Sequence, residues 1–185
     1  MKLALDISTK IIGIALMDKE IIYKQFNAES IKKKYKKENL SDFNLYMIIG
    51  KELLKEINEK SFDEIIIEEP LFNSANRGTV NKLLLTINTI ISTMLSEKYN
   101  LNIHHQNVNK VRSWFLKHKD ITFKEEKDKK LQTIEVLNTH YGFNLDQTFT
   151  DSADAIMHLI YFNNINKINE KELPKTKKSR VNKKG

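Results

Sequence analysis

The sequence contains no cysteine, no long apolar run and no leader-like amino terminus. Without cysteine, the chain has no disulfide, no thiol nucleophile and no cysteine-ligated zinc, so a metal ion would be held by oxygen or imidazole ligands. No apolar stretch approaches the ~20 residues that cross a bilayer. Only a few apolar residues precede Asp6, too few for a signal peptide. We therefore expect a cytoplasmic protein without a membrane segment.

Charge is distributed unevenly along the 185 residues. The net charge is +7, yet residues 171 to 185 hold seven of the 31 basic residues and one of the 24 acidic residues. Residues 1 to 170 are thus close to neutral and form the single expected domain. The basic tail and a second lysine cluster at residues 32 to 37 each fit either a phosphate contact or a solvated surface. The tail residues that would make such a phosphate contact are Lys177, Lys178 and Arg180.

Hydrophobic periodicity predicts five strands and five helices, without an internal repeat or a second core. The strands are expected at residues 2 to 7, 11 to 17, 20 to 26, 62 to 70 and 101 to 107. The helices are expected at residues 41 to 57, 79 to 99, 108 to 117, 129 to 142 and from 150 onward, with a charged, mobile link before the fourth helix. Three consecutive isoleucines in the fourth strand indicate burial on both of its faces.

The order of these elements predicts the fold. Three sequential strands should pair antiparallel, and the later strands should arrive through helical crossovers and lie parallel to the first. We therefore expect an α/β protein with a ribonuclease H-like fold, in which helices flank a five-stranded mixed sheet.

Carboxylates occupy positions where this topology predicts burial. Asp6 lies inside the first strand, Glu68 and Glu69 end the fourth, and Asp151 and Asp154 share one face of the last helix. A lone buried carboxylate costs roughly several kcal/mol unless it is paired or bound to metal. Because the first and fourth strands should be neighbours beneath the last helix, Asp6, one glutamate and both aspartates are expected to converge.

Converging carboxylates predict a divalent metal site. Four oxygen ligands suit hard cations such as Mg²⁺, with Mn²⁺ as a substitute. Two such ions about 4 Å apart can activate a water and stabilise the leaving oxygen in phosphodiester hydrolysis. This interpretation requires Asp6 to lie within a side chain's reach of the last helix. It also requires that no lysine or arginine fill the same spot.

Each acidic residue also has an interpretation without a metal. Asp151 is equally well explained as a first-turn acid favoured by the helix dipole, with Thr150 as the N-cap. Asp6 would instead be a turn residue bonded to Ser8 or Thr9, which its place inside a strand disfavours. Asp154 is harder to explain in this way because apolar positions flank it.

The choice between the two glutamates and the role of His158 also remain open. Glu68 and Glu69 point to opposite faces of their strand, so only one of them can be catalytic. His158, one turn beyond Asp154, either assists a ligand or water, or is a partly buried histidine of the helix face, which is the favoured interpretation.

With these residues in view, the chain resembles the RuvC family of Holliday-junction resolvases, as a divergent phage-like or viral-like member of a bacterial or virus-infected cell. The resemblance spans roughly residues 1 to 166. The first motif, LALDISTKIIGIAL, has the family's aspartate, here Asp6, and its glycine seven residues later, here Gly13. The last, Asp151-Ser-Ala-Asp154-Ala, matches the pattern D-x-x-D-A.

The middle motif of the resemblance leaves two alignments. Counting forward from Asp63 selects Glu68 as the catalytic glutamate, whereas counting back from Phe72 selects Glu69. One inserted residue, such as Pro70, reconciles the two counts. We prefer Glu68, because an apolar strand that ends in glutamate recurs across the wider superfamily.

The resemblance implies a homodimer that cuts a four-way junction by two symmetric nicks, with two metal ions in each active site. Phe72 matches an aromatic residue that probes the junction centre, and Lys110 and Lys129 match basic positions near the scissile phosphate. A symmetric junction calls for two identical sites related by one axis. The apolar positions of the helix at residues 79 to 99 exceed one narrow stripe and fit either core alone, which is the favoured interpretation, or core together with a dimer contact.

Three other functions compete with this one. A YqgF-like ribonuclease H-fold protein acting on RNA shares the first motif but is not expected to carry D-x-x-D-A with this tail. An actin-like ATPase core would need two lobes, for which the chain is too short. A non-catalytic protein that binds branched DNA would keep the fold and the carboxylates.

Overall fold

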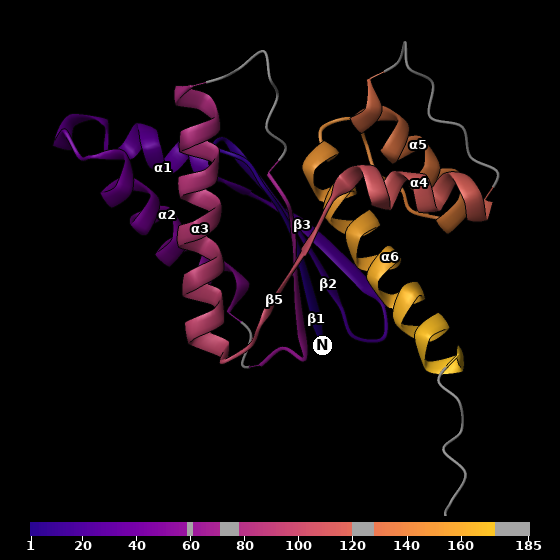
Figure 1. The fold of residues 1–185 in the computed structure, drawn as a ribbon. Helices are drawn as coiled ribbons and strands as arrows, with labels where there is room; N and C mark the ends of the chain where they lie inside the picture. The colour runs from indigo at the N-terminus through magenta and orange to yellow at the C-terminus, as the bar shows by residue number, and fades with distance from the viewer. Residues whose placement is uncertain (59–60, 71–77, 120–127, 173–185) are drawn as a thin grey trace, which may run out of the picture.

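The computed structural model describes residues 1–58, 61–70, 78–119 and 128–172. The strands are β1 (Lys2–Ile7), β2 (Ile11–Met17), β3 (Ile21–Asn27), β4 (Glu64–Glu68) and β5 (Ile103–Gln106). The helices are α1 (Ala28–Lys34), α2 (Asp42–Ile57), α3 (Thr79–Tyr99), α4 (Val108–Lys119), α5 (Lys129–Tyr141) and α6 (Thr150–Glu172), with a 3₁₀ turn, η1, at Lys36–Glu38. Figure 1 shows their arrangement.

The five strands form one mixed sheet in the order β3-β2-β1-β4-β5. The first three strands are antiparallel neighbours, and β4 and β5 then add parallel to β1. Helical crossovers connect the parallel strands, as parallel pairing requires. The predicted ribonuclease H-like fold is confirmed, including the adjacency of the first and fourth strands.

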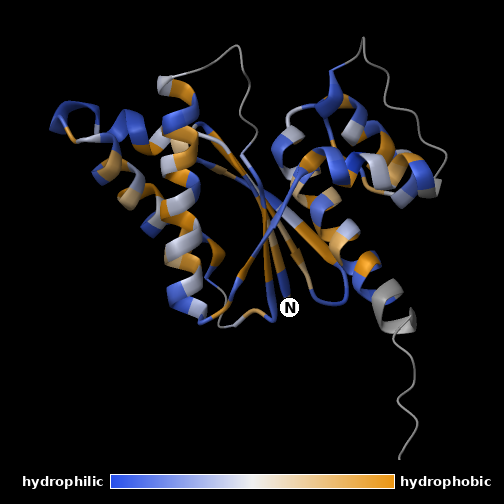
Figure 2. Cartoon of the chain, in the orientation of Figure 1, coloured by the Kyte–Doolittle hydropathy of each residue, from blue (hydrophilic) through white to orange (hydrophobic). Residues whose placement is uncertain are grey.

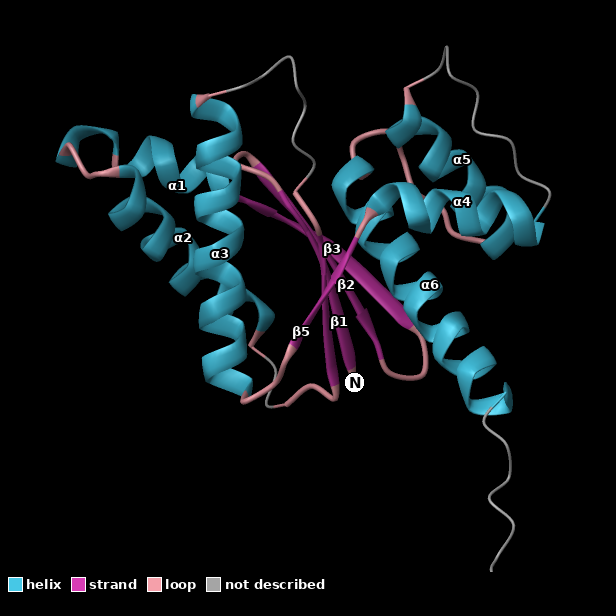
Figure 3. Cartoon of the chain, in the orientation of Figure 1, coloured by secondary structure: helices cyan, strands magenta, loops and turns pink. Residues whose placement is uncertain are grey.

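Helices cover both faces of the sheet (Figures 1 and 3). Helices α2 and α3 pack on one face, and α6, with α4 and α5 beside it, packs on the other. Successive residues of a strand point to opposite faces, so Leu3, Leu5 and Ile7 of β1 join the α2 and α3 core, while Ala4 faces α6. Figure 2 shows the hydrophobic residues of the strands between these two helical layers.

The α6 face of the sheet is lined with small residues where the helix begins. Gly13 of β2 lies opposite Asp6 of β1, and Ala4 and Ala15 lie on the same face. A Cβ atom on Gly13 would lie 2.1 Å from the backbone oxygen of Asp151, so no side chain fits there. The glycine therefore lets the first turn of α6 approach the sheet, which brings the aspartates of α6 close to β1.

Side-chain caps fix the start of three of the described helices, α1, α2 and α5. Ser41 accepts a hydrogen bond from the backbone N of Asn44 at the start of α2. Asp128 accepts one from the backbone N of Lys130 at 2.8 Å, which fixes the first turn of α5.

Three expectations about the chain's periphery have different outcomes. The lysine-rich segment at residues 32 to 37 belongs to α1 and η1, a helical region that the sequence analysis did not predict. Helix α6 continues to Glu172, slightly past the predicted domain end at residue 170. The rest of the basic tail, residues 173–185, and most of the charged link, residues 120–127, lie outside the described residues.

Candidate metal centre

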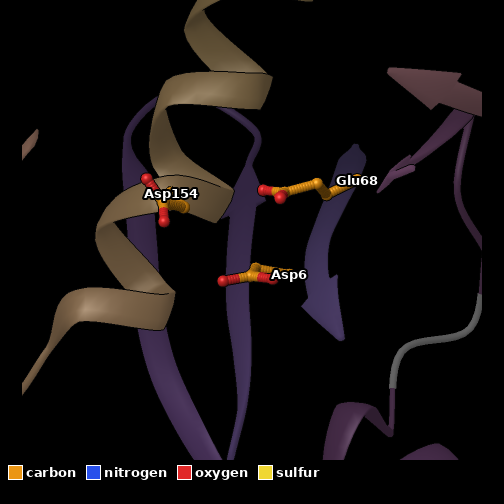
Figure 4. Close-up of side chains that lie close together, drawn as sticks. All are labelled: Asp6, Glu68 and Asp154. Atoms are coloured by element: carbon orange, nitrogen blue, oxygen red, sulfur yellow. The ribbon is translucent and has the colours of Figure 1, made fainter. Parts of the chain in front are cut away.

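Three carboxylates from three elements converge beneath the start of α6. Asp6 of β1, Glu68 of β4 and Asp154 of α6 each place one carboxylate oxygen within 4.8 Å of the other two (Figure 4). Asp6 is 7% exposed and Asp154 is 2% exposed, so the cluster lies at the edge of the core. The requirement that Asp6 reach the last helix is met.

The sheet register explains why Glu68, and not Glu69, joins Asp6. Leu5 of β1 pairs with Ile67 of β4, so the next residues along these parallel strands, Asp6 and Glu68, lie at the same level. Both point to the α6 face. Glu69 is exposed, and its backbone N donates to the carbonyl of Gln106 at 2.9 Å. Its side chain therefore has no part in the three-carboxylate cluster.

Asp151 lies beside the cluster but is held by a different partner. Its carboxylate accepts a hydrogen bond from Lys130 Nζ. Asp151 shares a face of α6 with Asp154, as the three-residue spacing predicted. It is not one of the three residues whose ligand atoms converge. In the structure, Asp151 therefore pairs with Lys130.

Two basic side chains contact the cluster, contrary to the second requirement set by the sequence. Lys130 Nζ lies 3.1 Å from Asp6 Oδ2 and 3.7 Å from Asp154 Oδ2. Arg112 Nη2 of α4 donates to Asp154 Oδ1 at 3.3 Å, and the Thr133 hydroxyl donates to the same oxygen at 3.2 Å. The condition that this spot be free of basic residues, which the sequence set for the metal site, is therefore not met, because α4 and α5 each bring one basic side chain to it.

Even with these cations in place, the pKa values of two of the carboxyl groups are raised. Burial, followed by the charge of Glu68, raises the pKa of Asp6 well above its ordinary value. Burial and then the charge of Asp154 raise the pKa of Glu68 to about 8. Lys130 opposes both shifts without cancelling them. Burial is therefore the main obstacle to the ionisation of both carboxyl groups, and their mutual repulsion adds to it.

Lys130 itself responds to the cluster. Burial lowers the pKa of its ammonium, but the carboxylates of Asp6, Asp154 and Asp151 together raise that pKa above the ordinary value. Lys130 therefore stays charged at neutral pH.

His158 holds Glu68 from the core side. It is fully buried, with Nε2 at 3.0 Å from Glu68 Oε2 and Nδ1 at 2.9 Å from Gln106 Oε1. Burial lowers the pKa of His158 to about 4, so the ring is neutral and carries one N–H. A ring that donates to Gln106 accepts at Nε2, which fits a protonated Glu68 in the absence of metal.

The residues present fit a hard divalent ion. The three converging groups offer only carboxylate oxygens, which Mg²⁺ and Mn²⁺ prefer. Burial and then a neighbouring carboxylate raise the pKa of both Asp6 and Glu68, and a bound ion would favour the ionised form of each. Asp6, Glu68 and Asp154 would hold such an ion.

The residues predicted to contact DNA are only partly described. Lys110 is exposed on α4, where it lines a shallow groove with Trp114 and Lys117. Lys129 is also exposed, and its neighbour Lys130 is the residue that reaches the carboxylates. The other expected contacts, Phe72, Lys177, Lys178 and Arg180, lie outside the described residues.

Four residues that touch the cluster or its support were not predicted from the sequence, namely Arg112, Lys130, Thr133 and Gln106. Helical spacing carried a signal for one of them. Lys130 lies three and four residues before Thr133 and Ile134, which are buried, so it shares their stripe of α5. Nothing in the local sequence around Arg112 indicates its contact.

In the described part of the chain, no helix is long and apolar enough to cross a membrane. No family model matches the sequence, and no curated protein matches it either.

Solved structures do resemble the fold. T. thermophilus RuvC in complex with a Holliday junction substrate aligns with a TM-score of 0.50 and 9% identity, over 89% of this chain and 94% of that one. A second Thermus thermophilus RuvC structure gives 0.51 and 9%, over 89% and 96%. The yeast mitochondrial Holliday junction resolvase Ydc2 gives 0.51 and 12%, over 87% and 76%. At these identities the comparison establishes a shared architecture: the chain has the fold of RuvC-type structures.

Proposed function

We propose that the chain is a metal-dependent, structure-specific endonuclease that resolves Holliday junctions or related branched DNA by paired symmetric nicks. The observation that carries the proposal is the convergence of Asp6, Glu68 and Asp154 in one cluster. RuvC and Ydc2 share the fold that brings these three residues together. One of the RuvC structures is a complex with a Holliday junction substrate, and Ydc2 is named as a Holliday junction resolvase. A divergent, phage-like or viral-like origin is part of the same proposal.

Mg²⁺ is the proposed ion, with Mn²⁺ as a substitute and two ions in the fully loaded site. Asp6, Glu68 and Asp154 supply the first set of ligands, and Asp151 becomes available as a fourth once Lys130 releases it. Ions bound there would activate a water and stabilise the leaving 3′ oxygen of a phosphodiester.

The chain's own groups have distinct roles in this proposal. Asp6, Glu68 and Asp154 are the catalytic carboxylates, and the neutral His158 fixes the orientation of Glu68 through its 3.0 Å hydrogen bond. Arg112 contacts Asp154 with one nitrogen, while its buried Nε has no hydrogen-bond partner among the residues that the structure describes.

The DNA contacts and the assembly belong to the same proposal. Lys110, exposed two residues before Arg112 on α4, and Lys129, exposed next to Lys130 on α5, are proposed DNA contacts, together with Lys177, Lys178 and Arg180 of the tail. Phe72, which follows β4, is the proposed probe of the junction centre. A homodimer would present two such sites to a two-fold symmetric junction.

One observation favours a second candidate, a non-catalytic protein that binds branched DNA. Lys130 and Arg112 already pair with the carboxylates, as they would in a purely structural ion-pair network. An RNA-directed nuclease of the YqgF type is the other alternative, and an RNA substrate in the assay separates it.

Cleavage of defined substrates tests the proposal. We expect nicking of a four-way junction with Mg²⁺ and none with EDTA, with slower cutting of Y-forks, linear duplex and RNA. Asp6→Asn and Asp154→Asn should each abolish cleavage while junction binding is kept or strengthened, because lost anionic charge no longer repels DNA. Glu69→Gln is the matched control, since its exposed carboxylate lies outside the cluster, and it should cut normally.

Three results would contradict the proposal. Cleavage that persists in both aspartate variants defeats the metal-site assignment. Junction binding without cleavage by the wild type supports the non-catalytic protein. Preferential cleavage of RNA supports the YqgF-like alternative.

A further inference from the structure

Lys130 occupies a position in the cluster that suits a cation. Its ammonium contacts Asp151, lies 3.1 Å from Asp6 Oδ2 and lies 3.7 Å from Asp154 Oδ2. Two of these three partners belong to the set that converges for a metal ion. The ammonium thus sits among the oxygens that a divalent ion would bind.

An ion and this ammonium cannot share these oxygens without a large cost. A divalent ion binds carboxylate oxygens at about 2.1 Å, which is closer than any ammonium contact. Binding of the ion therefore requires Lys130 to move away from Asp6 and Asp154.

The structure shows why Lys130 can leave while Arg112 stays. The Lys130 side chain is 40% exposed, whereas that of Arg112 is 14% exposed. The backbone N of Lys130 is held by the Asp128 cap, so only the flexible four-carbon side chain of Lys130 needs to change rotamer.

We infer that Lys130 is a resident cation of the carboxylate cluster, and that divalent ions bind in competition with it. Lys130 stabilises the metal-free protein by neutralising part of the cluster. The same contacts weaken metal affinity, and displacement frees both Asp151 and the ammonium. The displaced ammonium then lies at the mouth of the site, where a DNA phosphate is a suitable partner. This inference rests on the metal site of the proposed function.

Metal binding to the full chain tests the inference without any cleavage assay. Mn²⁺ affinity is measured by isothermal titration calorimetry, and free Mn²⁺ is counted by electron paramagnetic resonance, for the wild type, Lys130→Met and Lys129→Met. Lys129 is the matched control, because it is the adjacent residue and its side chain is exposed. Lys130→Gln serves as a second variant if Lys130→Met does not fold.

We expect Lys130→Met to bind Mn²⁺ at least about tenfold more tightly than the wild type, because a competing charge is gone. Lys129→Met should match the wild type. Without metal, Lys130→Met should melt at a lower temperature than the wild type, and Mn²⁺ should raise its melting temperature by more. Lower stability without metal, together with tighter Mn²⁺ binding, is the result expected if Lys130 competes with the ion for the carboxylates.

Unchanged or weaker Mn²⁺ affinity in Lys130→Met and Lys130→Gln overturns the inference, while the proposed function stands if the wild type cuts junctions. If the wild type and variants bind Mn²⁺ as expected but no branched DNA is cut, the proposed function fails and the inference stands. If none of the proteins binds Mn²⁺, both fail.

Discussion

The raised pKa of Glu68 predicts that the metal-free protein loses stability as the pH rises. Glu68 has a pKa of about 8 in the folded chain, against an ordinary value of 4.5. Between these two values the folded state binds a proton that the unfolded state has released. Linkage then requires the free energy of unfolding to fall across this window.

The size of the effect follows from the same shift. One pKa unit corresponds to about 1.4 kcal/mol, so complete ionisation of Glu68 costs the fold up to about 5 kcal/mol. Between pH 6.5 and 8.5 the expected loss is about 2 kcal/mol, which is about 4 to 8 °C in melting temperature for a chain of this size. Burial lowers the pKa of His158 to about 4, which acts in the opposite direction, but that contribution is largely complete above pH 6.5.

Glu68→Gln isolates this contribution. The amide keeps the size of the side chain and cannot ionise, and it also removes the charge that helps to raise the pKa of Asp6. Urea unfolding in EDTA, followed by circular dichroism at several pH values, should show a flatter profile for Glu68→Gln than for the wild type. Mg²⁺ should abolish the loss in the wild type, because a bound ion favours the ionised carboxylate. Glu69→Gln is the control and should retain the wild-type profile.

Equal pH profiles for the wild type and Glu68→Gln in EDTA would refute the reasoning. They would mean that Glu68 is ionised in the folded chain without metal and that Lys130 and Arg112 balance the cluster completely. A protein whose pH profile is the same in EDTA and Mg²⁺ would refute the link between this carboxylate and the ion.

Two further predictions concern the packing of α6 and the tail. Gly13→Ala places a Cβ atom 2.1 Å from the backbone oxygen of Asp151, so we expect a loss of about 3 kcal/mol or more in urea unfolding, together with weaker Mn²⁺ binding as α6 moves away from the sheet. A wild-type free energy of unfolding in this variant would contradict the close approach. Removal of residues 173–185 takes away six basic residues, so junction affinity should fall and its log–log salt slope should decrease by up to about 5. An unchanged slope would show that the tail contacts no phosphates.

The fold could be predicted from the sequence because its strands and most of its helices have strong local signals. The three isoleucines of β4 and the 3.6-residue period of α3 need no tertiary information, and the chain order then leaves few topologies. Helix α1 was missed because its sequence, AESIKKK, offers few apolar positions and its lysines suggest a solvated loop. Its start depends on a side-chain cap from Asn27 and on packing against β2 and α2.

The carboxylates could be predicted as a group, since buried acids in distant segments require a common partner. Their cations could not, because the contacts of Lys130 and Arg112 depend on where α4 and α5 sit relative to α6. The choice of Lys129 over Lys130 illustrates the difficulty: adjacent residues of a helix point about 100° apart, and only the phase of the buried stripe distinguishes them. That phase is visible in the sequence once Thr133 and Ile134 are known to be buried.

The balance of charge is the strongest physical argument that the cluster has a function. A structural ion-pair network gains little over hydrophobic packing even when its charges match. Here Asp6, Glu68, Asp151 and Asp154 meet two basic side chains, and burial, followed by a neighbouring carboxylate, raises the pKa of both Asp6 and Glu68. Gly13 is needed to bring α6 close enough to bury these groups together. A sequence that maintains closely packed carboxylic acids whose ionisation is costly gives up stability that a bound cation would recover.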